Sequence, residues 1–156
     1  MNGDGELGRA FARGVIAAMA MSGLRKVTTG LGLVEQIPPK RVALEGMPAL
    51  AHRVSPERRD VVVELAHWTF GGVGGAAFGL LPELVRRQVW SGPVYGVGVW
   101  LGYELLLAPI LGLHRRNEPS LSERAALIAD HVLYGVVVAS SPWPHEPRST
   151  SPARAG

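Results

Sequence analysis

The stretch VVVELAHWTFGGVGGAAFGLLPELV, residues 61–85, decides the fold class of this chain. Over its first 21 residues, the only acidic or basic side chains are those of Glu64 and His67. A helix of that length crosses the ~30 Å hydrocarbon core of a lipid bilayer. Residues 94–113 form a similar stretch with one charged residue, Glu104. Both stretches predict membrane-spanning helices.

Two further apolar stretches, residues 10–33 and 122–142, carry more charge. Arg25 and Lys26 interrupt the first of them. We expect these two side chains either to reach a membrane interface or to face the interior of a helix bundle. Near the end of the third predicted helix we expect a kink, because Pro109 cannot donate a backbone hydrogen bond.

Helix-start signals and prolines divide the chain between these stretches. Ser55 and Ser120 stand at expected N-cap positions, with Pro56 in a first helical position and Glu123 three residues after Ser120. Prolines between residues 35 and 60 exclude a continuous helix there. We therefore predict an all-α fold, a four-transmembrane-helix bundle. The membrane domain covers 10–143 with helices at about 10–33, 57–85, 94–113 and 122–142, between an N-terminal tail at 1–9 and a disordered tail at 144–156.

The composition of the 156 residues suits one domain in a membrane. The formal charge is +3, and the basic residues come in pairs that flank the apolar stretches. We therefore expect the lipid bilayer, and not nucleic acid, as a partner. Ten of the 16 Lys and Arg residues fall on the side of the first and third loops, which favours termini outside the cell. The absence of cysteine excludes disulfide bonds and thiolate chemistry.

A short string of the form His-x-x-aromatic-Gly occurs twice, as HWTFG at residues 67–71 and as HVLYG at residues 131–135. The glycines after His67 recur every four residues and so share one helix face with it. Small residues on such a face let helix backbones approach closely in lipid. The pattern indicates two repeated helix pairs. The predicted packing residues are Gly71, Gly75, Gly79 and Gly135.

Five ionisable residues form a polar group in or near the predicted spans: Glu64, His67, Glu104, Asp130 and His131. Three interpretations remain open. In the first, Glu64 and Asp130 lie in interfacial first turns, while the histidines and Glu104 satisfy one another. In the second, the group forms a pathway for protons or a small solute. In the third, His67 and His131 ligate a haem or a metal ion.

Several local features also match one protein family. They are the opening GVIAAMAMS at 14–22, the Pro38–Pro39 pair, His67 with its glycines, the Tyr103–Glu104 pair, and His131 with Gly135. With these features the chain resembles the YagU-type small inner-membrane proteins of bacteria. The resemblance implies a multi-pass protein of the cell inner (plasma) membrane, largely of unknown activity, with a tie to acid tolerance in some relatives.

Signatures of nucleophilic, phosphate-binding and zinc-dependent catalysis are missing from the sequence. We therefore assign no catalytic residue, and we expect neither an enzyme nor a cofactor. The preferred hypothesis is a membrane scaffold or accessory subunit that packs through its glycine faces against a membrane-protein partner or a second copy. The alternative is a proton-coupled transporter or proton conductance that uses the intramembrane His and Glu residues. A bis-His haem or metal-binding bundle is the third hypothesis.

Overall fold

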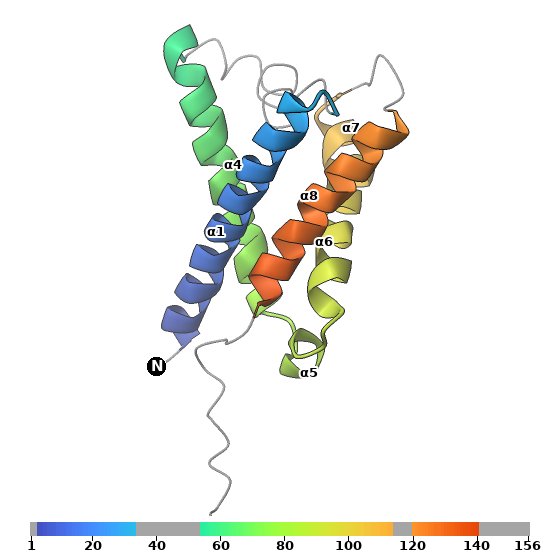
Figure 1. Cartoon of the computed structure of the whole chain (residues 1–156). Coiled ribbons are helices and arrows are strands. Elements are labelled where there is room, and N and C mark those ends of the chain that lie inside the picture. Colours follow the sequence, from blue (N-terminus) through green and yellow to red (C-terminus); the bar gives the residue numbers. More distant parts are fainter. Residues whose placement is uncertain (1–2, 34–53, 114–119, 141–156) are drawn as a thin grey trace, which may run out of the picture.

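The computed structural model describes residues 3–33, 54–113 and 120–140, and in these ranges every regular element is helical. The all-α prediction is confirmed for this part of the chain. The described helices form four long rods, one of which is a continuous run of three elements (Figure 1). The elements are α1 (Gly3–Gly30), α4 (Pro56–Gly79), α5 (Glu83–Arg86), α6 (Ser91–Gly102), the π-helical turn η2 (Tyr103–Leu107), α7 (Ala108–Ile110) and α8 (Leu121–Ala139).

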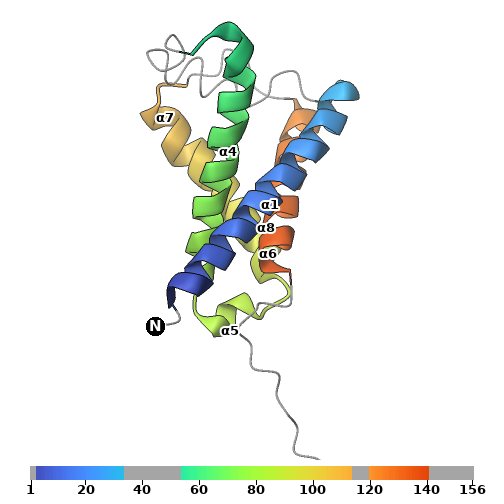
Figure 2. The ribbon, with the colours of Figure 1, turned by 90° about the vertical axis from the view of Figure 1, so that its left-hand side faces the viewer.

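The rods alternate in direction, so α5 and the N-terminal end of α1 lie at the same end of the bundle (Figures 1 and 2). α1 packs along α4, α6 packs along α8, and a third contact between α1 and α8 joins these two helix pairs. Arg13 of α1 strengthens the joint, because it donates a hydrogen bond to the carbonyl oxygen of Ser140 just beyond α8. The result is a bundle of two helix pairs.

The helix α1 begins earlier than the sequence predicts. A tail was expected at residues 1–9, but the described part of this segment is helical from Gly3. Ala10 is buried, and Phe11 packs close to Gly72 of α4. The tail prediction is wrong over these residues. Ala10 and Phe11 pack against α4, and the first turns of α1 continue the helix from this packed part toward the N-terminus. The predicted tail at 144–156 lies outside the described residues.

The second predicted helix, 57–85, is divided. α4 ends at Gly79, and the four-residue helix α5 follows. Pro82 explains the division, because a proline disfavours helical backbone in the residue before it and removes one amide donor. The third and fourth helices lie close to their predicted bounds. α6 begins three residues earlier than predicted, and α8 ends at Ala139.

Both predicted N-cap serines occupy cap positions. Ser120 accepts a hydrogen bond from the backbone nitrogen of Glu123 at 3.1 Å, as the sequence predicts. Ser55 precedes Pro56 at the start of α4, but its side chain makes no capping hydrogen bond to the backbone. The predicted cap position of Ser55 is therefore correct, although its side chain does not form the capping hydrogen bond.

A π-helical turn, η2, interrupts the third rod just before Pro109. In a regular α-helix the proline ring would collide with the carbonyl group four residues earlier. The wider turn relieves that collision, and the backbone nitrogen of Ala108 bonds to the carbonyl oxygen of Tyr103. Because Glu104 lies within this turn, the distortion also affects the position of a predicted site residue.

Glycines make the two helix crossings unusually close. At the α1–α4 crossing, a Cβ atom added to Gly14 would lie 2.1 Å from the carbonyl oxygen of Gly71, and one on Gly75 would lie 2.6 Å from the Cα of Gly14. At the α6–α8 crossing, a Cβ atom on Gly135 would lie 1.9 Å from the carbonyl oxygen of Gly92. Any larger residue would push the paired backbones apart.

Each His-x-x-aromatic-Gly string therefore lies at the crossing of its own helix pair. Gly71 and Gly135, which end the two strings, both meet backbone atoms of the neighbouring helix. Gly79, the remaining predicted packing glycine, is the last residue of α4 and is half-buried.

The outer surface of the bundle is apolar. Among the described helices, two are long and apolar enough to cross a membrane, namely Pro56–Gly79 and the continuous rod Ser91–Ile110. Most residues in both apolar windows are not buried by the rest of the bundle. Large apolar side chains are also exposed on the other two rods, for example Ile16, Met19, Val27 and Val136.

Candidate functional site

A buried ion pair joins α1 to α8. The Nε atom of Arg25 donates a hydrogen bond to Oδ2 of Asp130 at 3.2 Å, and the two side chains are only 4% and 1% exposed. Arg25 thus faces the bundle interior, one of the two positions expected for it, whereas Lys26 is exposed. The first interpretation gave Asp130 a place in the first turn of its helix, but Asp130 lies near the middle of α8, with its carboxylate buried against a cation.

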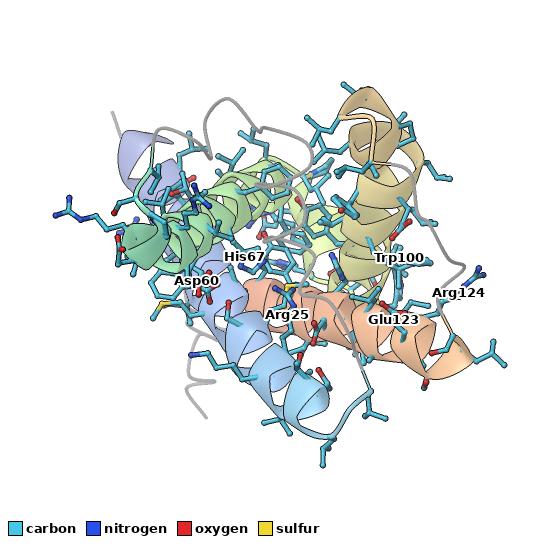
Figure 3. All side chains as sticks on the ribbon, turned by 90° about the horizontal axis from the view of Figure 1, so that it is seen from above. Arg25, Asp60, His67, Trp100, Glu123 and Arg124 are labelled. Carbon is cyan, nitrogen blue, oxygen red and sulfur yellow. The ribbon has the colours of Figure 1, made fainter. Side chains whose placement is uncertain are left out.

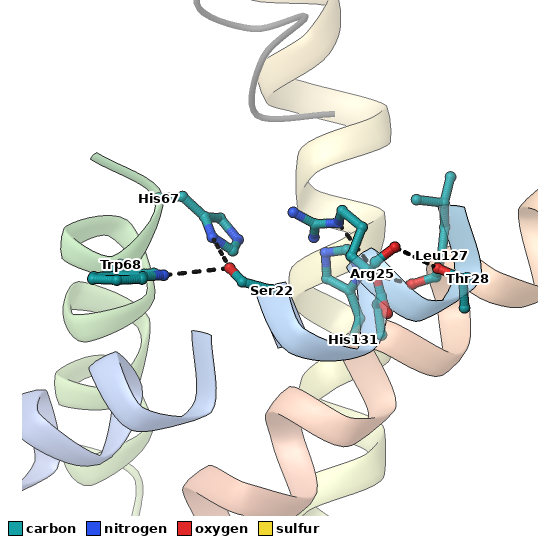
Figure 4. Close-up of polar contacts among 8 residues, drawn as sticks. Ser22, Arg25, Thr28, His67, Trp68, Leu127 and His131 are labelled. Carbon is teal, nitrogen blue, oxygen red and sulfur yellow. Dashed lines mark hydrogen bonds and ion pairs between the residues drawn. The ribbon is translucent and has the colours of Figure 1, made fainter. Parts of the chain in front are cut away.

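The histidines have polar partners other than those expected. The Nδ1 atom of His67 lies 3.4 Å from the hydroxyl of Ser22, which also accepts a hydrogen bond from Nε1 of Trp68 at 3.3 Å (Figure 4). The Nδ1 atom of His131 lies 2.7 Å from the carbonyl oxygen of Leu127. The first interpretation is therefore also wrong in pairing the histidines with each other and with Glu104.

These partners determine whether the other ring nitrogen of each histidine, Nε2, donates or accepts a hydrogen bond. A carbonyl oxygen can only accept, so Nδ1 of His131 donates, and Nε2 of the neutral ring is an acceptor. The Ser22 hydroxyl, already accepting from Trp68, can donate its own hydrogen to His67. A neutral His67 that accepts this bond carries its proton on Nε2. The two rings then offer opposite hydrogen-bonding groups.

A cavity of about 360 Å³ lies between the two helix pairs. Such a volume is at the lower end of the ~300–1,000 Å³ that is typical of small-molecule sites. Its wall is mainly apolar and is built from all four rods. The polar side chains that line it are Arg25, His67, Trp100, Tyr103, Glu104, His131 and Tyr134.

The structure therefore brings three of the five predicted site residues to one cavity: His67, Glu104 and His131. Asp130 does not line the cavity. It accepts a hydrogen bond from Nε of Arg25, and Arg25 does line the cavity. Glu64 is half-buried on α4 and does not line the cavity. In the view along the bundle, Arg25 and His67 lie toward the middle of the four rods (Figure 3).

Two donors at the cavity have unused hydrogen-bonding capacity. Arg25 bonds through Nε, and within the described ranges its terminal Nη1 and Nη2 groups make no hydrogen bond. The indole Nε1 of Trp100 is buried and likewise has no partner among the residues described. A buried donor without a partner is costly, so the indole nitrogen of Trp100 calls for an acceptor at this place, and the terminal nitrogens of Arg25 can donate to the same acceptor.

The sequence did not single out Trp100, Arg25 or Ser22 as site residues. The sequence marks Arg25 as an interruption of an apolar stretch, a residue that either reaches an interface or faces the bundle interior. That interruption was the available signal, because a charged residue inside a span usually faces the bundle interior or a water-filled cavity.

The cavity is closed toward the α5 end of the bundle. The hydroxyls of Tyr134 and Tyr95 donate hydrogen bonds of 2.6 Å to the carbonyl oxygens of Gly71 and Gly74. Beyond them the ring of Phe78 packs edge-on against Tyr95 at a centroid distance of 5.1 Å, and Phe78 is fully buried. Among the described residues, these side chains fill the bundle between the cavity and α5, so the site has the form of a pocket there.

A metal centre built from protein side chains alone has little support here. Among the described residues, no group of three or more His, Asp or Glu side chains could hold a metal ion. His67 and His131 line the same cavity with Nδ1 engaged, which leaves Nε2 of each ring as the atom that could reach a haem iron. No protein-family model, curated protein or solved structure matches this chain.

Proposed function

We propose that this chain is a four-helix integral membrane protein of the inner membrane that carries a small solute bound in the cavity between its two helix pairs. The observation that carries the proposal is the position of this cavity. It lies at the interface between two helix pairs, and it is lined by the buried Arg25 and the half-buried His67, Glu104 and His131. Carriers built from repeats commonly bind their substrates at such an interface.

The exposed apolar surface supports a membrane location for all four rods. α1 and α8 fall outside the two candidate spans of the described chain, and both carry charged residues. Two of these charges, on Arg25 and Asp130, neutralise each other in the interior instead of facing outward. With that pair removed from the outer surface, α1 and α8 present apolar side chains such as Ile16, Met19 and Val136 where lipid would contact them. The resemblance to YagU-type proteins agrees with this placement.

The glycine contacts favour a carrier over a scaffold. A scaffold that docks through its glycine faces needs glycines that a partner helix can reach. Gly71, Gly75 and Gly135 are buried, and each meets a glycine or other backbone of its own chain. These faces therefore serve packing within the bundle.

The side-chain packing between the cavity and α5 favours a carrier over a proton conductance. A proton conductance needs a continuous polar path across the membrane. Here the tyrosine hydroxyls bond to α4 carbonyls below the cavity, and Phe78 and Val138 fill the space beyond. A solute that enters from one end can leave at the other only after the helix pairs move. The α1–α8 contact is the joint about which the pairs would rock.

Cysteine accessibility tests the proposal without knowledge of the solute, because the natural chain contains no cysteine. Val99 lines the cavity from α6, so Val99→Cys places one thiol at the site. A membrane-impermeant maleimide should label this thiol in both right-side-out and inside-out vesicles, since a carrier exposes its site to each side in turn. Labelling from a single side, or from neither, would contradict a carrier.

The matched control is Val73→Cys on α4. Val73 is 58% exposed and does not line the cavity, so in the proposed bundle it faces lipid. This thiol should react from neither side. If it reacts as readily as the one at position 99, the surface of α4 is in water and the membrane placement is wrong.

A further inference from the structure

We propose that the solute held in the cavity is a single-chain amphipathic carboxylate, bound by the terminal Nη groups of Arg25. The role of this ligand as cargo rests on the proposed carrier function, whereas its binding does not. The carboxylate would lie against Arg25 and Trp100, and its apolar chain would lie along the apolar wall.

The unused face of Arg25 is the first support. The side chain is 4% exposed, so its guanidinium is almost entirely removed from solvent. Asp130 occupies Nε, and the described chain offers no acceptor to Nη1 or Nη2. These two nitrogens form a planar fork that matches the two oxygens of a carboxylate. Since Arg25 lines the cavity, an anion placed there can reach the fork.

The indole of Trp100 is the second, independent support. Its Nε1 atom is buried without a partner in the described structure, and the residue lines the same cavity from α6. An indole nitrogen can only donate, so it also requires an acceptor. His67 adds a third donor when its proton lies on Nε2. The unsatisfied groups at the cavity therefore select for oxygen acceptors.

The existing ion pair limits the charge of the ligand. Asp130 already balances the charge of Arg25, so a second anion gains from the free fork but has no full countercharge left to neutralise. A monoanion is therefore favoured over a phosphate ester, which carries about −1.5 to −2 charges at neutral pH. The carboxylate of Glu104 also lines the cavity, and its negative charge further disfavours a ligand with more than one negative charge.

The size and the lining of the cavity indicate the length and the apolar character of the ligand's chain. A volume of about 360 Å³ is near the lower end of small-molecule sites, which suits a ligand with a single chain of medium length. Decanoate is such a ligand, whereas a two-chain phospholipid is much larger. The apolar wall suits an alkyl chain; it includes Met21, Val63, Phe70, Val99, Leu107 and Leu127.

The test is equilibrium binding of radiolabelled decanoate to the protein in nanodiscs. The variant Arg25→Met/Asp130→Leu removes both charges together, because removing one alone would leave the other buried and unpaired. Binding to this variant also measures decanoate that merely dissolves in the lipid. We expect saturable binding to the natural chain. Binding to the double variant should be at least about tenfold weaker, because the charge-assisted contact between Arg25 and the carboxylate is lost. Equal binding to the two proteins would overturn the proposal.

Trp100→Phe keeps the inference testable if the double variant does not fold. This change removes the indole donor and keeps an aromatic ring against the cavity. It should weaken decanoate binding about tenfold to a hundredfold, as expected for one hydrogen bond to a charged group. Decanoate binding that is unchanged in Trp100→Phe would contradict the assigned position of the carboxylate.

Ligands of the same chain length test the head group. Decanol lacks the charge, decylamine reverses it, and decyl phosphate adds to it, so each should bind more weakly than decanoate. Decylamine binding as tightly would point to Glu104 instead of Arg25, and tighter binding of decyl phosphate would make the ligand a phosphate. Either result would overturn the carboxylate assignment. If decanoate fails to bind while Val99→Cys is labelled from both sides, this inference fails and the carrier function stands.

Discussion

The Nε atom of Arg25 on α1 lies 3.2 Å from Oδ2 of Asp130 on α8, and this contact joins the two helix pairs of the bundle. The same pair positions the free Nη fork of Arg25 at the cavity. A single interaction therefore links the assembly of the bundle to the ligand site. Its removal should affect both, and the two effects can be measured separately.

Removing Asp130 alone should strongly destabilise the protein. In Asp130→Ala the Arg25 cation stays buried without a countercharge, which typically costs about 3–5 kcal/mol. The double variant Arg25→Met/Asp130→Leu should lose much less, because a buried ion pair can often be replaced by apolar residues of similar volume. Thermal unfolding followed by circular dichroism in mild detergent gives the comparison. Equal losses in the two variants would mean that the pair contributes packing and not charge compensation.

Bulky residues at the helix crossings should prevent folding of the bundle. Gly75→Leu and Gly135→Leu would each force a side chain into the backbone of the neighbouring helix. Overpacking of a tight contact typically costs about 1–3 kcal/mol, and here the obstacle is backbone, which cannot rotate away. Gly98→Leu is the matched control, since a Cβ atom there meets nothing within 4 Å. The yield of monodisperse protein in detergent should fall for the first two variants only.

The four rods should place their ends alternately on the two sides of the membrane. Single cysteines at Leu7, Val89 and Ser140 mark the end that contains α5, and those at Leu31 and Leu121 mark the opposite end (Figure 1). The surplus of basic residues in the first and third loops predicts that the first group reacts from outside the cell and the second from the cytoplasm. If Leu121→Cys and Ser140→Cys react from the same side, α8 does not cross the membrane.

Helix periodicity and glycine spacing predicted much of this fold. The all-α class and the starts of α4 and α8 follow from patterns within single segments. Local signals also account for the errors at helix ends. The predicted second helix runs through Pro82, whereas the observed helix ends before it, because a proline disfavours helical backbone in the preceding residue.

The pairing of charges could not be predicted from such patterns. Arg25 and Asp130 are 105 residues apart, and their contact depends on how α1 crosses α8. Without that crossing, Arg25 could equally have reached an interface. The partners of the histidines were missed for a related reason, because Ser22 lies on another helix and Leu127 contributes a backbone carbonyl. The unfilled donor capacity of Trp100 is likewise visible only when its surroundings are known.

Purified protein should be colourless and free of stoichiometric metal. His67 and His131 each leave Nε2 toward a shared cavity, a geometry that two axial ligands of a haem also require. Among the described residues, however, no group of three or more His, Asp or Glu side chains could hold a metal ion.

An optical spectrum and metal analysis of the detergent-purified natural chain, beside His67→Ala/His131→Ala, decide between the two uses of the cavity. A Soret band or a bound metal that disappears in the double variant would contradict the carrier proposal, because the histidines would then be ligands. A colourless, metal-free natural chain leaves both Nε2 atoms to contact the solute. In that case the double variant should weaken decanoate binding, since it removes the His67 donor from the cavity that Arg25 and Trp100 also line.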